Sequence, residues 1–225
     1  MKKTMEILLP ESWADITLKT YLELITELKN YEGDEEASGA ILLWKLCGID
    51  GETLQGLSRD TFQKLRGALM SFLNRTEGPL QRIIEWNGKE WGFEPNLSQM
   101  SYGAYADITR WDTLTIDQNW PQIMDILYRP ITMKKGDLYV TEGYVGKPSG
   151  VDWMSVGMDV HFGALFFFVN LSMDLVKNTQ NYLMEMAGME ACSHTTSHES
   201  GEPMEQLLNS QVEMLRKLIP SLGNL

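Results

Sequence analysis

The sequence is poor in the side chains that usually build catalytic and metal centres, with two cysteines and three histidines among 225 residues. Cys47 and Cys192 lie in very different sequence contexts, which argues against a disulfide framework and is typical of a reducing compartment. Neither of the glycine-rich phosphate-binding patterns G-x-x-x-x-G-K and G-x-G-x-x-G occurs. No Ser, Cys or Thr stands in a recognisable nucleophile motif. We therefore predict a protein that is not an enzyme and has no cofactor.

Positive charge is also scarce, because 19 Lys and Arg face 31 Asp and Glu, for a formal net charge of −12. A chain of this sign is not expected to bind nucleic acid directly, since phosphates repel it. The apolar run around Phe166–Phe168 is soon followed by Asn170 and Asp174, so it is too short to cross a bilayer. Residues 1–10 lack the pattern of a signal peptide. These features predict a cytoplasmic protein without membrane contact.

Hydrophobic residues are plentiful, at 43% of the chain, and they concentrate between Val160 and Met186. The first half of this stretch is apolar on every side, so a helix there must be surrounded by other elements. We predict that this helix, in the C-terminal half, is the core of the fold. His161 lies on it, and a hydrogen-bonded core or surface histidine is favoured there over a catalytic base.

The N-terminal third is predicted to form three amphipathic helices. The first follows Thr17, a suitable N-cap, and the third follows Ser58. The second spans Ala37–Cys47 and ends at Gly48 in the usual C-terminal manner. Cys47 is then best interpreted as a small buried hydrophobic side chain. Together these helices would make one layer of the fold.

The middle of the chain carries the clearest strand signal. Asn87-Gly88 tolerates positive φ at both turn positions, which predicts a β-hairpin near 82–93. A helix is expected after Asn119, and Arg129-Pro130 should end it. Leu138–Thr141 could be a further strand. The predicted fold class is therefore mainly α with a small β-hairpin (α+β), a helical layer around the buried helix.

Arg129 leaves two interpretations open. It could contact a phosphate or a carboxylate of a ligand. The alternative, which we favour, is an ion pair at the end of the preceding helix, where a positive charge also suits the helix dipole.

Four short phrases stand out between Pro10 and Ile131. They are Pro10-Glu-Ser-Trp13-Ala-Asp-Ile16-Thr-Leu-Lys-Thr-Tyr21, Asn87-Gly88-Lys89 with Phe93-Glu-Pro-Asn-Leu97, Met100-Ser-Tyr-Gly-Ala-Tyr105-Ala-Asp107, and Ile126-Leu-Tyr128-Arg129-Pro130. These phrases resemble proteins from the structural-gene blocks of tailed bacteriophages, especially phages of Bacteroidota. They are similar to proteins described as tail-assembly-chaperone-like or as virion morphogenesis proteins, although such relatives usually carry Glu where this chain has Ala104. The resemblance includes no catalytic residues.

The resemblance implies a phage morphogenesis protein. Its most direct form is a chaperone-like factor that binds phage structural proteins, such as tail or neck components, without turnover. Such a factor works in the cytoplasm of the infected bacterial host. The alternative is a structural component of the virion, meaning a head, neck or tail protein or packaged cargo. A homo-oligomer is compatible with both.

The end of the chain divides into a polar linker and an amphipathic helix, which gives the predicted organisation 1–187, 188–203 and 204–225. The helix either folds back onto its own domain or docks into a groove on a partner. In the second case, its apolar stripe would be the partner-binding site. That stripe comprises Met204, Leu207, Leu208, Leu215, Leu218 and Ile219.

The linker holds the chain's one cluster of metal-binding side-chain types, formed by Cys192, His194 and His198. A closed structural zinc site normally has four ligands, and no fourth is evident. The surrounding Ser, Thr and Gly residues are typical of a mobile polar linker. We therefore predict no native metal site.

Overall fold

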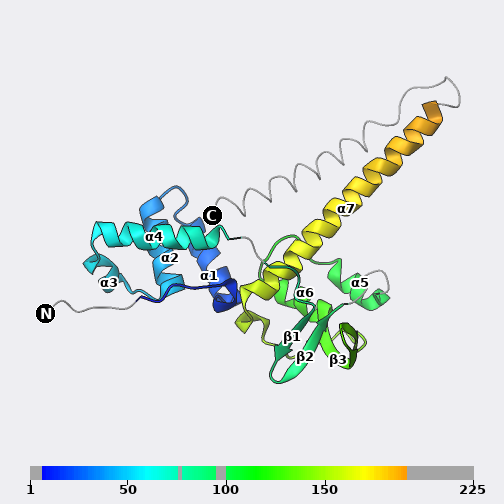
Figure 1. The fold of residues 1–225 in the computed structure, drawn as a ribbon, viewed down its shortest axis with the longest axis horizontal. Helices are drawn as coiled ribbons and strands as arrows, with labels where there is room; N and C mark the ends of the chain where they lie inside the picture. Colours follow the sequence, from blue (N-terminus) through cyan, green and yellow to red (C-terminus); the bar gives the residue numbers. More distant parts are fainter. Residues whose placement is uncertain (1–6, 76–77, 95–99, 192–225) are drawn as a thin grey trace. The chain divides into compact units, whose positions relative to one another are not determined.

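The computed structural model describes residues 7–75, 78–94 and 100–191. The chain divides into two compact units, Met1–Leu165 and Phe166–Leu225. Helices predominate, and the described strands form one small antiparallel sheet (Figure 1). The predicted mainly α (α+β) fold class is confirmed.

Four helices, drawn in blue and cyan in Figure 1, form the N-terminal layer. Their apolar sides meet in a buried cluster that includes Leu24, Leu43 and Leu69. Cys47 packs against this cluster but is only half-buried, and that burial raises the pKa of its thiol. The helices are α1 (Leu18–Lys29), α2 (Glu35–Cys47), the unpredicted α3 (Gly51–Gly56) and α4 (Arg59–Leu73).

The ends of these helices follow from local side-chain chemistry. Thr17 Oγ1 accepts a hydrogen bond from the Thr20 amide at 3.2 Å, and Ser58 Oγ accepts one from the Thr61 amide at 3.1 Å. Gly48 closes α2 in the left-handed conformation, with a φ of 66°. These three boundaries are as predicted. α2 begins two residues earlier than expected, because Asp34 caps it.

The sheet has the strand order β1-β2-β3-β4, with every neighbouring pair antiparallel. The predicted hairpin corresponds to β1 and β2, and its turn residues Asn87 and Gly88 have φ values of 50° and 71°. Both values are positive, as a tight primed turn requires. The strands are β1 (Ile83–Trp86), β2 (Lys89–Phe93), β3 (Tyr128–Lys135) and β4 (Leu138–Thr141).

Strand β3 was not predicted, because Arg129-Pro130 was interpreted only as the end of a helix. The chain instead passes directly from helix α6 (Trp120–Leu127) into the strand. Pro130 has no amide hydrogen, but its carbonyl accepts a hydrogen bond from the Glu142 amide at 2.9 Å. Further along, Ile131 pairs with Thr141 and Met133 with Val140. Thr132 is therefore the extra residue of a β-bulge.

Four further elements complete the described chain, and the first is a short 3-10 helix, η1 (Trp13–Asp15), which precedes α1. Helix α5 (Tyr102–Ile108) is capped by Ser101, whose hydroxyl accepts a hydrogen bond from the Ala104 amide, and a second short 3-10 helix, η3 (Trp153–Ser155), leads into the long helix α7 (Met158–Ala191). The Met158 amide donates to the Ile16 carbonyl at 2.8 Å, so the start of α7 is joined to the segment before α1.

The expectation of a buried helix is confirmed for the first turns of α7. His161 to Leu165 are buried, and so are Phe168 and Val169. Met173, Tyr182 and Met184 are 38%, 60% and 72% exposed, so the prediction is wrong for these residues. Asn170, Asp174 and Lys177 interrupt the apolar run in this part of the sequence and give the helix a polar side.

Candidate protein-binding surface

One face of the sheet belongs to the core. Trp91, Phe93 and Tyr128 are 6%, 3% and 0% exposed. The Tyr128 ring lies 5.3 Å from that of Phe93 and 5.6 Å from that of Trp153, measured between centroids. Its hydroxyl donates to the Gln81 carbonyl at 2.6 Å, and burial raises its pKa. We call this side of the sheet the core face.

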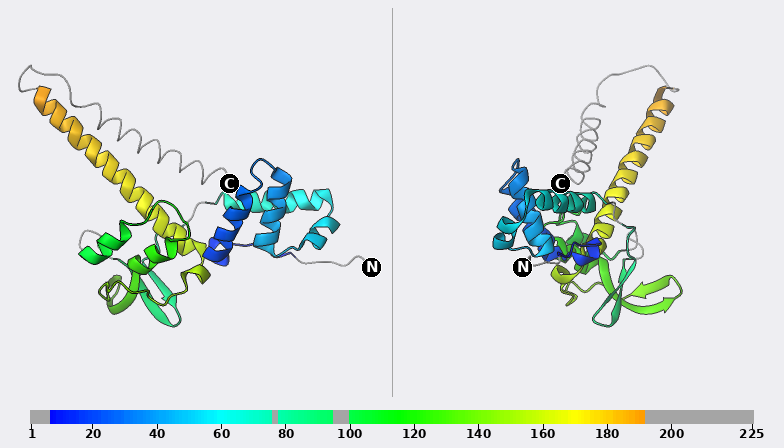
Figure 2. Two further views of the ribbon diagram at one scale, coloured as in Figure 1. Left: turned by 180° about the vertical axis from the view of Figure 1, so that it is seen from behind. Right: turned by 60° about the vertical axis from the view of Figure 1, so that its left-hand side comes forward.

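The core face continues into the β3–β4 hairpin, where it is exposed. Alternation along the strands places Met133, Leu138 and Val140 on the side of Tyr128, and Met133 pairs directly with Val140. These three side chains are 70%, 77% and 57% exposed. Figure 2 (right) shows the hairpin extending beyond β1 and β2. We call these three residues the hairpin face.

The opposite side of β4 is anchored to the rest of the sheet. Tyr139 lies against Gly92 so closely that a Cβ atom there would be 2.5 Å from the tyrosine ring. The Tyr139 hydroxyl lies 2.7 Å from the Phe93 carbonyl and 3.0 Å from the Arg82 carbonyl. Only glycine leaves room for this ring. The hairpin is thus held in place from one side while its apolar side stays open.

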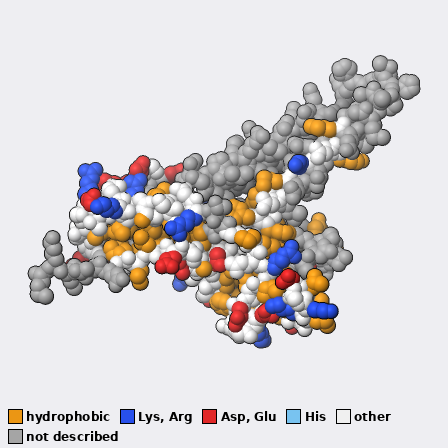
Figure 3. Space-filling view, in the orientation of Figure 1, with side chains coloured by type: hydrophobic (Ala, Val, Ile, Leu, Met, Phe, Trp, Pro, Cys, Tyr) orange, Lys and Arg blue, Asp and Glu red, His pale blue; other side chains and the backbone are white. Residues whose placement is uncertain are grey.

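The hairpin carries two adjacent lysines, which lie on opposite sides of the sheet, and Asp137 lies in its turn. Lys134 forms an ion pair with Glu90 at 2.5 Å, and Lys135 follows at the end of β3. Lys135 pairs across the hairpin with Leu138, next to the hairpin face. Orange and blue side chains adjoin at the lower right of Figure 3, in the region of β3. The surface therefore combines apolar area with positive charge.

Arg129 is an ion-pair residue at the end of α6, as favoured from the sequence. Its guanidinium binds the Glu94 carboxylate, donates to the Ile126 carbonyl at 3.5 Å, and donates to Thr141 Oγ1 at 3.2 Å. The Arg129 and Glu94 side chains are only 11% and 9% exposed. The pair therefore links α6, the end of β2 and β4, and it is a structural contact.

His161 is a hydrogen-bonded core histidine, as expected. It is 0% exposed, and both ring nitrogens have partners, the Trp120 indole and the Trp153 carbonyl, each at 3.1 Å. Burial lowers its pKa to about 4, because the charged form would lose its hydration. The imidazole is neutral at physiological pH and acts as a connector within the core.

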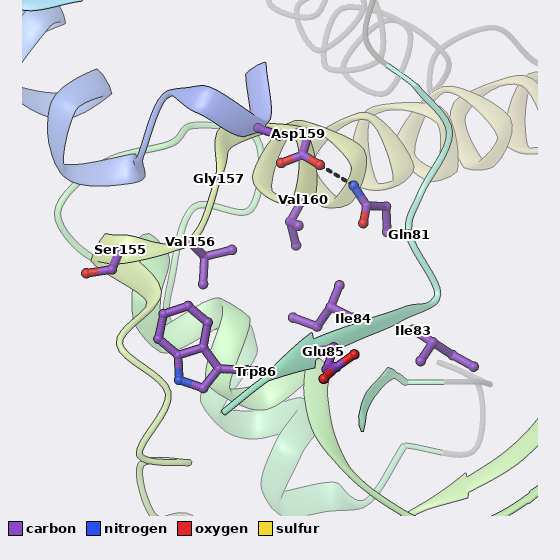
Figure 4. A pocket seen from close by; sticks show the side chains of 11 residues that line it. Gln81, Ile83, Ile84, Glu85, Trp86, Ser155, Val156, Gly157, Asp159 and Val160 are labelled. Atoms are coloured by element: carbon purple, nitrogen blue, oxygen red, sulfur yellow. Dashed lines mark hydrogen bonds between the residues drawn. The ribbon is translucent and has the colours of Figure 1, made fainter. Parts of the chain in front are cut away.

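An open depression of about 310 Å³ lies between β1 and the start of α7 (Figure 4). Its polar lining includes Gln81, Glu85, Ser155 and Asp159. Asp159 accepts a hydrogen bond from Gln81 at 2.5 Å. Glu85 lies on the opposite side of β1 from the buried Ile84, so the two carboxylates do not converge. The depression brings together no pair of groups suited to acid–base chemistry.

The sequence-predicted partner-binding residues Met204, Leu207, Leu208, Leu215, Leu218 and Ile219 lie outside the described residues, as do Cys192, His194 and His198. Within residues 7–75, 78–94 and 100–191, no three His, Cys, Asp or Glu side chains are grouped so that they could hold a metal ion. In the same part of the chain, no helix combines the length and apolarity needed to span a bilayer.

Comparison with known proteins found no match, either among protein-family models or among curated proteins and solved structures. The likeness of the four phrases to phage morphogenesis proteins stays a prediction. The hairpin face was not identified from the sequence. Its signal there is slight, an alternation of Leu138 and Val140 with Tyr139 and Thr141.

Proposed function

We propose that the protein is a binding protein that acts without turnover, as a chaperone-like assembly factor for the structural components of a tailed phage. The observation that carries the binding function is the hairpin face. Its three large apolar side chains are exposed on the same side of the sheet on which Trp91, Phe93 and Tyr128 are buried. Apolar area of this kind is typical of a protein-binding site.

The physical gain from covering this face is appreciable. Fully burying a Leu, Val or Met side chain is worth about 1.5–3 kcal/mol. Met133, Leu138 and Val140 together therefore offer several kcal/mol before the cost of association is subtracted. The net charge of −12 favours solubility, while Lys135, which pairs with Leu138, favours a client with negative charge near its apolar contact.

The phage context rests on the resemblance of the phrases between Pro10 and Ile131. Under this proposal the clients are tail or neck proteins, and binding takes place in the cytoplasm of the infected host. The second candidate function is a structural component of the virion, which the same phrases favour. Immunoblots of purified particles beside infected-cell lysate separate the two, because an assembly factor is absent from finished particles and a structural component is present.

The hairpin face is tested by a pair of matched variants. Met133→Lys places a charge at the centre of the face, whereas Leu8→Lys changes a residue of similar exposure, 76% against 70%, in the N-terminal segment. Tagged protein is used to capture phage proteins from infected lysate. We expect Met133→Lys to reduce capture of the same phage structural protein about tenfold or more, since a desolvated charge costs over 1.4 kcal/mol.

Leu8→Lys should capture the phage protein like the unmodified chain. Equal capture by both variants would remove the hairpin face from the proposal. If the unmodified protein captures no phage structural protein, the assembly function itself is wrong.

A further inference from the structure

β4 is an outer strand of the sheet and has an open edge. The Glu142 amide donates to the Pro130 carbonyl, and the Val140 carbonyl accepts from Thr132 Oγ1, so these residues direct backbone groups toward β3. Because backbone groups alternate along a strand, Tyr139 and Thr141 direct theirs toward the open edge. Figure 2 (right) shows no other described strand alongside β4.

Within the described residues, the four-residue length of β4 is the main protection of this edge. Natural sheets discourage pairing at their edges with charged side chains, prolines, or a covering helix or loop. β4 consists of Leu138-Tyr-Val-Thr141 and contains neither a charge nor a proline. The other outer strand, β1, contains Glu85. The open edge of β4 is thus the one whose sequence suits pairing with another strand.

We infer that β4 pairs antiparallel with β4 of a second copy of this chain, around a two-fold axis at Tyr139. The sheets of the two copies would become one continuous sheet. This inference concerns self-association and does not rest on the proposed client.

The sequence of β4 is self-complementary in this register. Leu138 lies opposite Val140 of the second copy, and symmetry repeats the contact, so four apolar side chains gather on the core face of the joined sheet. Moving the axis by one residue to Val140 places Leu138 opposite Glu142 instead. The apolar pattern therefore selects the axis at Tyr139.

Charge also favours a second copy as the occupant. In the same register, Glu142 of the second copy lies opposite Gly136, beside Lys135 at the end of β3. The contact occurs twice, so Lys135 of each copy meets Glu142 of the other. These local attractions act against the general repulsion between two chains of net charge −12.

The joined sheet would also double the hairpin face. Met133, Leu138 and Val140 of both copies would lie on one side, with Met133 one strand away from the joint. Met133→Lys should therefore leave the dimer intact while it weakens client capture. Variants at Leu138 and Val140 test the β4–β4 contact between the two copies. Failure of the dimer proposal can therefore be distinguished from failure of the client-binding proposal.

The test uses two charge-bearing double variants of the full chain. Leu138→Lys/Val140→Lys and Leu138→Glu/Val140→Glu each place like charges opposite one another at the joint, and like pairs across strands are destabilising. Sedimentation velocity over a concentration series measures the dimer dissociation constant. We expect the unmodified protein to be dimeric. The dimer dissociation constant of each double variant should be higher by about tenfold or more.

An equal mixture of the two double variants should restore dimerisation, because every introduced lysine then faces an introduced glutamate. Leu8→Lys is the matched control and should retain the dissociation constant of the unmodified protein. Circular dichroism establishes that the variants are folded, as expected for exposed positions. A monomeric unmodified protein overturns the inference, including the case in which β4 pairs instead with a client strand. The inference is also overturned if both double variants dimerise like the unmodified protein, or if the mixture of the two stays monomeric.

Discussion

Trp120 donates its indole N–H to Nδ1 of His161 at 3.1 Å, and both side chains are fully buried. Because Nδ1 accepts this bond, the proton of the neutral imidazole lies on Nε2, which donates to the Trp153 carbonyl. The ring thus connects α6, η3 and α7 with both nitrogens satisfied. Protonation of Nδ1 would place two donors, Nδ1–H and the indole N–H, against each other. It would also bury a positive charge in the core.

The first prediction is a loss of stability in mild acid. His161 has an unfolded pKa near 6.5 and a folded pKa of about 4, so between these values the unfolded chain binds a proton that the folded chain does not. The free energy of unfolding has its full value above pH 6.5. It should fall by roughly 3 kcal/mol as the pH drops to 4. Asp15 and Asp50 have lowered pKa values and titrate below this window.

Urea unfolding at several pH values measures this slope, and His161→Gln identifies its source. The glutamine amide can still donate to the Trp153 carbonyl but cannot titrate. The variant should be less stable at pH 7, because the Trp120 indole loses its acceptor. Its stability should nevertheless be nearly constant between pH 6.5 and 4. A slope equal to that of the unmodified protein would assign the acid sensitivity to other groups.

The second prediction concerns Gly92. Gly92→Ala places a methyl group 2.5 Å from the Tyr139 ring, so the ring must move and β4 with it. We expect a loss of about 1–3 kcal/mol, as for other insertions into a packed site. Gly103→Ala is the matched control, because its nearest neighbour is Tyr144 at 3.7 Å, an ordinary contact. That change, inside α5, should be neutral or stabilising.

Thermal melting of both variants measures the difference. In a chain that already carries Tyr139→Ala, the cost of Gly92→Ala should largely disappear, since the nearest remaining neighbour is then Thr141 Cγ2 at 3.0 Å. An unchanged cost in that background would mean that the strand conformation, and not the tyrosine ring, requires glycine.

The third prediction separates two phenylalanines of α7. Phe162 is 5% exposed, with its ring centroid 4.8 Å from that of Trp13 and 5.4 Å from that of Tyr21. Phe162→Ala should cost about 3–5 kcal/mol, a large part of the stability of a small protein. Phe167 is half-buried, so Phe167→Ala should cost clearly less. Urea midpoints compare the two, and equal losses would contradict the burial difference.

The fourth prediction addresses the sequence-predicted binding helix. Deleting the chain from Met204 onward should leave the remainder folded and weaken client capture, if the stripe from Met204 to Ile219 is a partner-binding arm. Covering a stripe of six apolar side chains is worth on the order of 10 kcal/mol before ordering entropy is subtracted. If the helix instead completes the core, the truncated protein should aggregate. A melting curve and the capture assay on the same truncated preparation distinguish the two.

Local signals in the sequence located most elements. The caps Thr17 and Ser58, the left-handed Gly48 and the Asn87-Gly88 turn act within a few residues, so each could be recognised from its neighbours. Helix boundaries therefore agreed within about two residues where a cap was identified.

Features that depend on distant partners were not predictable in the same way. Tyr139 requires Gly92, which lies 47 positions earlier, and His161 requires Trp120, 41 positions earlier. Strand β3 was missed because Pro130 is a helix terminator locally, and only its pairing with Trp91 reveals a strand. The hairpin face could not be predicted for the same reason. Its exposure depends on how far the elements that cover the core face of the sheet extend, and these are distant in the sequence.

The bulge at Thr132 decides which side of the sheet the following residues of β3 occupy. The extra residue places Met133 opposite Val140 and Lys134 opposite Tyr139. If Thr132 itself paired with Val140, Met133 would lie opposite Tyr139 and Lys134 opposite Leu138, so that the methionine and the lysine would exchange sides of the sheet. The ion pair to Glu90 and the hairpin face therefore both depend on Thr132 staying unpaired. Loss of the Thr132 codon would leave both in place, because it removes the unpaired residue and keeps Met133 opposite Val140.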